Sequence, residues 1–305
     1  MHLTYRALPE DHGQRAVDVL IRQTGMSRLL SKKIRLYGQL TCNGQAHRMI
    51  DPVRAGDVLV AIYQPSPGHG GVLNTVPGVD VRFLDDWLLV VSKPAGMVTH
   101  PTYLHETGSL NSSLADYPLH PVSRLDRDTS GLVLIARNGH AHHVISQNPM
   151  DKIYLGLVHG RIPGASGLID APIRRSAGSI MLREVHPDGA VAKTRWRELH
   201  YFEKSDVAMI SFELLTGRTH QIRVHCRHAG CPLIGDGLYG WPSDPEKDHG
   251  PGSDLDRLIG RQALHAASLR FIHPISASPV RLTAPLPEDY LNLLRQLYRR
   301  EHSQL

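Results

Sequence analysis

The sequence predicts an α+β fold: a mixed, largely antiparallel sheet, preceded by a small N-terminal α/β domain. In the body of the chain, short β-rich segments bounded by turn residues outnumber helical segments and do not alternate regularly with them. A Pro- and Gly-rich stretch after residue 63 separates this body from the first residues. The balance of charged residues also changes there. Residues 1–63 hold nine of the 34 Lys or Arg residues and five of the 29 Asp or Glu residues, whereas the rest of the chain holds 25 basic and 24 acidic residues.

Residues 1–63 are predicted to form the N-terminal domain. The apolar spacing in residues 14–37 predicts two short amphipathic helices, separated at Gly25. Asn43-Gly44 is a strong hairpin signal, and residues 56–63 have the alternation of a strand. The excess of basic residues favours binding of a polyanion, although a solvated basic helix would have the same composition.

Residues 64–80 are predicted to be a linker, and residues 81–305 a second, larger domain. Two strands should meet at Asp85-Asp86. Residues 241–256, which are polar and rich in turn formers, should form an exposed loop. Further strands are expected at 131–138, 152–162, 193–202 and 207–218, and helices at 140–149 and 219–230, the second with Thr219 as its N-terminal cap.

Composition excludes several classes of protein. No apolar run is long enough to span a membrane, and the N-terminus is too polar for a signal peptide, so we expect a cytoplasmic protein. The three cysteines include no CxxC and favour neither a disulfide framework nor a zinc site. The chain also lacks a dinucleotide fingerprint and a phosphate-binding loop. We therefore expect no metal, no cofactor and a monomer.

The segment PVSRLDRDTSGLVLIARN places charged residues directly before a strand that must be buried. Asp126 should lie at the edge of that strand, where Gly131 permits a tight turn. A carboxylate beside apolar packing needs a cation to stay ionised. Read alone, the segment is compatible with a solvated turn or with a catalytic carboxylate.

Two further segments offer partners for Asp126. In residues 214–240, helical spacing places Arg223 beside an apolar stripe, from which its guanidinium could reach across the sheet to a carboxylate. In DKIYLGLVHG, Tyr154 shares one strand face with Lys152. A tyrosine offers a flat apolar surface and a hydroxyl, although most strand tyrosines only pack.

These motifs, taken in order, resemble the RluA family of pseudouridine synthases. VVSKPAGMVTHP, VSRLDRDTSGLVLIARN, KIYLGLVHG, AKTRW, LLTGRTHQIRVH, GCPLIGDGLYG and RQALHAASLRFIHP follow that family's succession. SRLLSKKIRLYGQLTCNG with VRAGDVL resembles the alpha-L RNA-binding module, which would direct basic residues toward phosphates: Arg28, Lys32, Lys33 and Arg35. The combination resembles family members that modify large-subunit ribosomal RNA.

The resemblance implies the family's fold, an isomerisation of uridine without a cofactor, and roles for single residues. Asp126 matches the catalytic aspartate, Tyr154 the tyrosine beside the uracil, and Arg223 the basic residue that pairs with the aspartate. Arg124 matches the arginine that holds the target base out of its stack. Ser123 departs from the histidine usual at that position, which affects the local RNA contact. Asp126 could act as a nucleophile or remove a proton from the ribose.

Three other interpretations have distinct requirements. DRDTSG resembles the Asp-x-Asp motif of phosphatases that use an aspartate nucleophile and magnesium, but that motif follows the first strand of a parallel α/β sheet. An RNA-binding protein without catalysis would not need Asp126, Tyr154 and Arg223 together. His140 and His143 could meet on a helix as metal ligands, but no third ligand is evident and RNA-facing or surface imidazoles are favoured.

Overall fold

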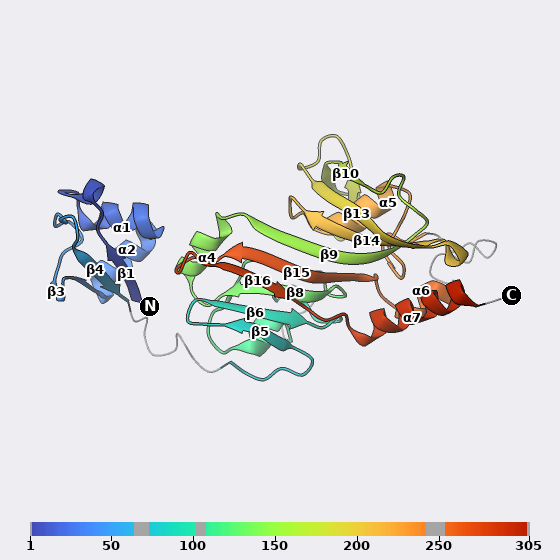
Figure 1. Ribbon diagram of the computed structural model, residues 1–305, viewed down its shortest axis with the longest axis horizontal. Coiled ribbons are helices and arrows are strands. Elements are labelled where there is room, and N and C mark those ends of the chain that lie inside the picture. Colours follow the sequence, from blue (N-terminus) through green and yellow to red (C-terminus); the bar gives the residue numbers. More distant parts are fainter. Residues whose placement is uncertain (1, 64–72, 102–107, 242–253, 304–305) are drawn as a thin grey trace.

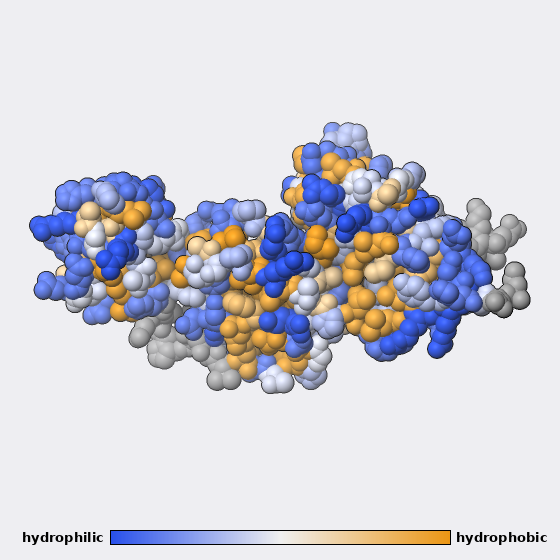
Figure 2. All heavy atoms as spheres, viewed as in Figure 1, coloured by the Kyte–Doolittle hydropathy of each residue, from blue (hydrophilic) through white to orange (hydrophobic). Residues whose placement is uncertain are grey.

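The computed structural model describes residues 2–63, 73–101, 108–241 and 254–303. Figure 1 shows a small N-terminal unit next to a long twisted sheet, with the C-terminal helix at the far end of that sheet. In Figure 2 hydrophilic residues cover most of the visible surface of the N-terminal unit. Within the described ranges no helix has both the length and the apolar character needed to cross a membrane.

The N-terminal unit is built on a four-stranded sheet of order β1-β4-β2-β3. Gly25 ends the first of its two helices with a φ of 66°, and the side chain of Ser27 caps the second by accepting from the Leu30 amide. Asn43 and Gly44 turn the hairpin with φ values of 52° and 81°. The unit comprises β1 (His2–Arg6), a 3-10 turn (Pro9–Asp11), α1 (Ala16–Thr24), α2 (Arg28–Tyr37), β2 (Gln39–Cys42), β3 (Gln45–Ala46) and β4 (Val58–Ile62).

The body of the chain forms a ten-stranded sheet. Its main path runs β10-β13-β14-β9-β15-β8-β6-β5, and β16 and β7 join it at β15 and β8. Its strands are β5 (Asp80–Leu84), β6 (Leu88–Lys93), β7 (His120–Pro121), β8 (Ser130–Ala136), β9 (Met150–His159), β10 (Ser166–Asp170), β13 (Lys193–Phe202), β14 (Val207–Leu214), β15 (Leu264–Ile272) and β16 (Pro279–Thr283). The predicted α+β class is confirmed, because among the described strands β8 and β15 alone pair in parallel.

Helices and a separate hairpin lie against this sheet. The hairpin consists of β11 (Ile173–Arg175) and β12 (Arg183–Val185). The helical segments are α3 (Leu110–Leu114), α4 (Gly139–Ser146), a 3-10 turn (Glu203–Ser205), α5 (Gln221–His228), α6 (Asp254–Ile259) and α7 (Glu288–His302). In Figure 1, α5 lies beside β13 and β14, and α6 and α7 lie together at the C-terminal end.

Strands β6 and β8 are buried on both faces, which explains their unbroken apolar runs. Alternate residues pack into two clusters, as the two-residue period of a strand requires. Leu89, Val91, Val133 and Ile135 belong to the cluster that includes α3 and α5, and Leu88, Val90, Leu132 and Leu134 belong to the one that includes α4. The strand after Asp126 is therefore fixed from both sides.

The parallel pair of β8 and β15 depends on a glycine. Gly131 stands opposite Ala266 with a φ of 112°, and a Cβ there would lie 2.3 Å from the Ala266 carbonyl oxygen. No side chain fits so close to a backbone atom. Gly131 thus allows the approach that joins the start of β8 to the C-terminal part of the sheet.

The predicted linker, residues 64–80, is only partly described. Residues 64–72 lie outside the described ranges. Leu73, Val76 and Val79 pack against the main hydrophobic cluster, and β5 begins at Asp80. The second half of this segment is therefore attached to the large sheet.

Candidate active site

A cavity of about 500 Å³ lies where four parts of the chain meet, the first of them residues 98–100. The loop before β8 contributes Arg124 and Asp126 to its wall, β9 contributes Lys152 and Tyr154, and the segment before α5 contributes Arg218. The two residues that share a face of β9 by strand periodicity thus both line the cavity. This is the size of space in which proteins commonly bind small ligands or single nucleotides.

The backbone around Asp126 is held at several points. The Thr99 hydroxyl accepts from the amide of Leu125 at 3.1 Å and donates to its carbonyl at 3.0 Å. The Asp126 carbonyl accepts from the Thr129 amide at 3.1 Å, and the Lys93 ammonium donates to the carbonyl of Arg127 at 3.0 Å. These contacts fix the loop independently of any side-chain interaction of Asp126 itself.

Arg223 joins Asp126 to a second carboxylate. Its Nη1 donates to Asp126 Oδ2 at 3.0 Å, while Nε and Nη2 donate to the two oxygens of Asp236 at 2.8 and 2.7 Å. The side chains of Arg223 and Asp236 are 6% and 0% exposed, and that of Asp126 is 24% exposed. Burial alone would lower the pKa of Arg223, but the hydrogen bonds and charges of Asp236 and Asp126 raise it above its ordinary value. The guanidinium therefore stays charged beside Asp126.

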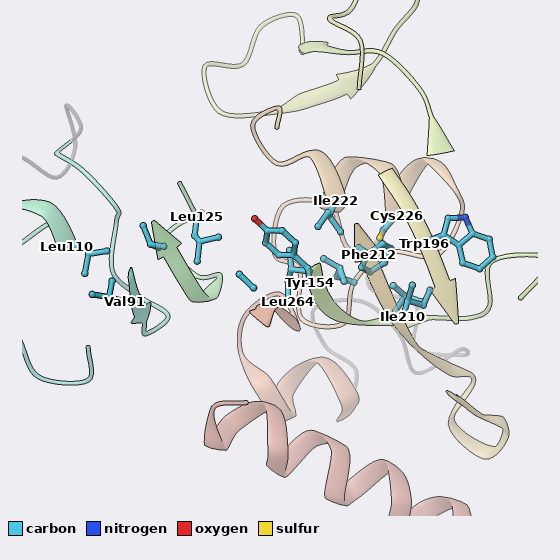
Figure 3. Close-up of a cluster of buried hydrophobic side chains, with 14 of the residues drawn as sticks. Val91, Leu110, Leu125, Tyr154, Trp196, Ile210, Phe212, Ile222, Cys226 and Leu264 are labelled. Atoms are coloured by element: carbon cyan, nitrogen blue, oxygen red, sulfur yellow. The ribbon is translucent and has the colours of Figure 1, made fainter. Parts of the chain in front are cut away.

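Tyr154 forms a buried wall next to the carboxylate. Figure 3 shows its ring between Leu125 and Phe212, with the hydroxyl end directed away from Phe212. Burial, and then the charge of Asp126, raise the pKa of the Tyr154 hydroxyl, so it remains protonated. Gly156, two residues on, leaves room for Phe212, whose ring would lie 2.8 Å from a Cβ at that position. The wall can therefore offer a ring face and a neutral hydroxyl.

Arg124 is exposed on the rim of the cavity, two residues before Asp126. The neighbouring Ser123 also lines the cavity, and its hydroxyl accepts from the Leu134 amide at 2.9 Å. Residues 123–129 form bends and turns rather than a strand, so Arg124 and Asp126 owe their shared cavity to the anchored Leu125 between them.

The basic residues predicted to contact RNA lie on another element. Arg28, Lys32, Lys33 and Arg35 are all exposed on α2 and are called the α2 cations below. None of them forms a salt bridge with a described residue. The structure does not bring them into the cavity at Asp126.

The structure corrects three local expectations. Helix α5 begins after His220, which has a φ of 57°, and Thr219 is not its cap. Residues 254–256 belong to α6, where Asp256 is buried, and the rest of the predicted loop, 242–253, lies outside the described residues. His140 is buried and does not lie at the surface. Among the described residues no group of histidine, cysteine or carboxylate side chains could hold a metal ion.

Sequence reasoning missed Thr99, Lys93, Asp236 and His220 as parts of the site. The signal for Asp236 was its place inside the apolar segment CPLIGDGLYG, where a buried aspartate needs a cation. Thr99 and Lys93 act through backbone groups far away in sequence, for which a single sequence has no signal. The phosphatase alternative is wrong, because its fold requires a parallel sheet.

Comparisons with known proteins agree with the motifs. The family model described as RNA pseudouridylate synthase matches residues 87–228. An uncharacterised RNA pseudouridine synthase of Bacillus subtilis is 34% identical over 90% of this chain and 96% of its own length. The ribosomal large subunit pseudouridine synthase D of Xylella fastidiosa is 36% identical over 88% of this chain and 83% of its own.

A solved structure shares the fold. The human RNA pseudouridylate synthase domain containing 1 has a TM-score of 0.53 and 23% identity, with 70% of this chain and 86% of that one covered. The family that the ordered motifs indicate is thus confirmed. The chain belongs to the RluA-type RNA pseudouridine synthases, which are isomerases that convert uridine in RNA to pseudouridine.

Proposed function

We propose that Asp126 carries out the isomerisation and that the substrate is a uridine of large-subunit ribosomal RNA. One observation carries the first part: a carboxylate with one oxygen bound to a buried guanidinium faces a cavity with a tyrosine wall. The second part is supported by relatives in Xylella fastidiosa, Xanthomonas campestris and Pseudomonas aeruginosa that are named ribosomal large subunit pseudouridine synthase D.

In the reaction the bond between N1 of uracil and C1′ of ribose breaks, the base turns, and C5 bonds to C1′. A proton leaves C5 and N1 gains one, so the net composition is unchanged. Asp126 Oδ2 is held by Arg223, which leaves Oδ1 free to react. Oδ1 either attacks C1′ or the base as a nucleophile, or removes a ribose proton so that uracil departs as an anion.

The target base must leave the RNA stack to reach this carboxylate. Unstacking costs a few kcal/mol, which stacking on an aromatic ring and a side chain that fills the gap can offset. Tyr154 is the ring that lines the cavity, and Arg124 is the exposed cation at its rim. We assign them these two roles.

The α2 cations would bind phosphates and hold the RNA on residues 1–63. Two observations support this role. The α2 cations are exposed and form no ion pairs with the described residues, and the sequence resembles the alpha-L module. Phosphate contacts of this kind give affinity without sequence preference, so choice of uridine would remain with the catalytic cavity and its surroundings. One chain supplies every group named here, so we propose a cytoplasmic monomer.

The test uses total RNA labelled with 5-tritiated uridine, isolated from a strain that lacks the gene and then separated by size. The protein should release tritium from large-subunit ribosomal RNA, and Asp126→Asn should bind that RNA but release none. Asp128→Asn, whose side chain instead pairs with Arg127 at 3.0 Å, is the matched control and should stay active. Release only from transfer RNA would overturn the substrate, and an active Asp126→Asn would overturn the site.

A further inference from the structure

His220 has a backbone conformation that its position in the helix does not require. Its φ of 57° and ψ of 21° lie in the left-handed region, which is costly for a residue other than glycine or asparagine. It stands just before α5 but makes no side-chain cap, and Thr219, a better capping residue, precedes it. The imidazole lines a smaller adjoining cavity of about 60 Å³, whose wall shares Asp126 and Tyr154 with the larger cavity.

Both imidazole nitrogens have defined neighbours. Nδ1 lies 2.8 Å from the Tyr239 hydroxyl oxygen, and Nε2 lies 3.9 Å from Asp126 Oδ1. Oδ1 is the carboxylate oxygen that Arg223 does not hold. The imidazole thus stands next to the reactive oxygen without forming a hydrogen bond to it, at a distance that leaves its Nε2 available to another group.

The Tyr239 hydroxyl can hold His220 in the tautomer that carries its hydrogen on Nε2. Its oxygen already accepts from the amide of Arg183 at 2.9 Å, so its own hydrogen is available to donate to His220 Nδ1. A neutral imidazole that accepts at Nδ1 carries its hydrogen on Nε2. Burial lowers the pKa of His220, and Arg223 and Arg183 lower it further, whereas Asp126 and Asp236 raise it. The net lowering of the pKa favours the neutral ring.

Isomerisation requires a hydrogen-bond donor. When the glycosidic bond breaks, negative charge spreads over N1 and the two carbonyl oxygens of uracil, which must be held while the base turns. Two of the nearby cations are engaged: Arg223 binds two carboxylates, and Lys93 donates to three backbone carbonyls, those of Pro94, Met97 and Arg127. His220 Nε2 lies on the side of Asp126 that carries the reactive oxygen Oδ1, 3.9 Å from it.

We propose that His220 is a catalytic residue that donates a hydrogen bond from Nε2 to the detached uracil, and that Tyr239 is a positioning residue that fixes this tautomer. The proposal rests on the assignment of Asp126 as the reacting carboxylate. No proton transfer is involved, because the hydrogen bond only stabilises the charge on the leaving base until C5 has bonded to C1′.

Two substitutions separate this role from a structural one. Asparagine tolerates the left-handed conformation and can place a polar atom near the position of Nδ1. It should therefore replace His220 well if His220 only maintains the backbone conformation or the contact with Tyr239. Glutamine reaches the position of Nε2 with an N–H group but suits the left-handed backbone less well. A catalytic donor therefore predicts more activity in His220→Gln than in His220→Asn, and a structural residue predicts the reverse.

The measurement is single-turnover tritium release from the labelled RNA described above, with the protein in excess. His220→Asn should lower the maximal rate by about 10²- to 10³-fold, the usual effect of removing one donor to a developing charge, without weakening half-saturation. His220→Gln should retain at least about tenfold more rate than His220→Asn. Tyr239→Phe, which keeps the ring 5.1 Å from Arg223 Cζ, should lower the rate while leaving RNA binding intact.

His228→Asn is the control, because His228 is exposed on the same helix, and it should behave like the unmodified protein. If His220→Asn keeps the full rate while Asp126→Asn has none, the proposal for His220 fails and the site stands. If Asp126→Asn is itself active, the proposed function of the site is refuted, and the role of His220 with it. An order of activity with His220→Asn above His220→Gln would show that the residue is structural.

Discussion

Replacing Arg223 with methionine should destabilise the protein as well as inactivate it. Methionine fills similar space but leaves Asp236, whose side chain is 0% exposed, without a cation. Among the described residues, the Asp236 carboxylate would keep its hydrogen bonds from the Leu238 and Tyr239 amides, at 3.0 and 3.1 Å. Removing one partner of a buried ion pair costs about 3–5 kcal/mol of unfolding free energy, because the other charge remains buried and uncompensated.

The loss can be measured by denaturant unfolding at neutral pH and by thermal melting, where about 2–4 °C is expected for each kcal/mol in a domain of this size. Arg227→Met on the same helix is the control. Arg227 lies over the Trp241 ring at 4.6 Å and forms no salt bridge with a carboxylate of the described residues, so its loss should cost about 1 kcal/mol or less. Adding Asp236→Leu to Arg223→Met should recover at least half of the lost stability, because the uncompensated charge is gone. Arg223→Met with unchanged stability would refute the reasoning.

Three further predictions concern other parts of the chain. Changing Lys32, Lys33 and Arg35 to alanine should weaken RNA binding. The slope of log affinity against log salt concentration should become shallower by up to about 0.9 for each lost phosphate contact. An unchanged slope in a binding titration would contradict the assigned role. Thr99→Val should cost about 1–3 kcal/mol by leaving the Leu125 amide without its acceptor, and should slow tritium release, whereas Thr99→Ser should do neither. Burial, with a smaller effect of His143, lowers the pKa of His140 to about 4. Because the histidine of the unfolded chain binds a proton already near pH 6.5, the folded protein loses stability as the pH falls from about 6.5 to 4. His140→Phe should lose less stability over that interval in urea unfolding, and parallel curves would show that His140 does not contribute.

The predicted elements of the fold were those with a local cause. Gly25 and Asn43-Gly44 end or turn elements through their own backbone preferences, and the apolar runs of β6 and β8 are long enough to indicate burial on both faces. Where the prediction was wrong, a distant contact overrode the local pattern. Asp256 looks like part of a polar loop, but it is buried in α6 because His159, 97 residues earlier, pairs with it at 3.1 Å.

In the site, too, residues with a local sequence signal could be predicted, whereas residues that depend on distant contacts could not. Asp126, Tyr154 and Arg223 stand in motifs with local signals, and the structure brings the three together. His220 was hidden because its sequence neighbour Thr219 satisfies the ordinary rule for a helix start, whereas the chain uses a strained residue in its place. Asp236 and Thr99 act by satisfying groups from other segments, and their importance depends on a geometry that periodicity does not contain.

The parallel contact of β8 with β15 sets the order in which the enzyme can mature during synthesis. The loop at Asp126 is held by Arg223, 97 residues later, and the Thr129 hydroxyl at its end accepts from Gln262, 133 residues later. Contacts of such separation form late, because the intervening chain must first be made and closed into a loop. A ribosome-bound chain that has not yet exposed β15 would therefore lack a finished site, so nascent copies should be unable to modify RNA until translation has passed that strand.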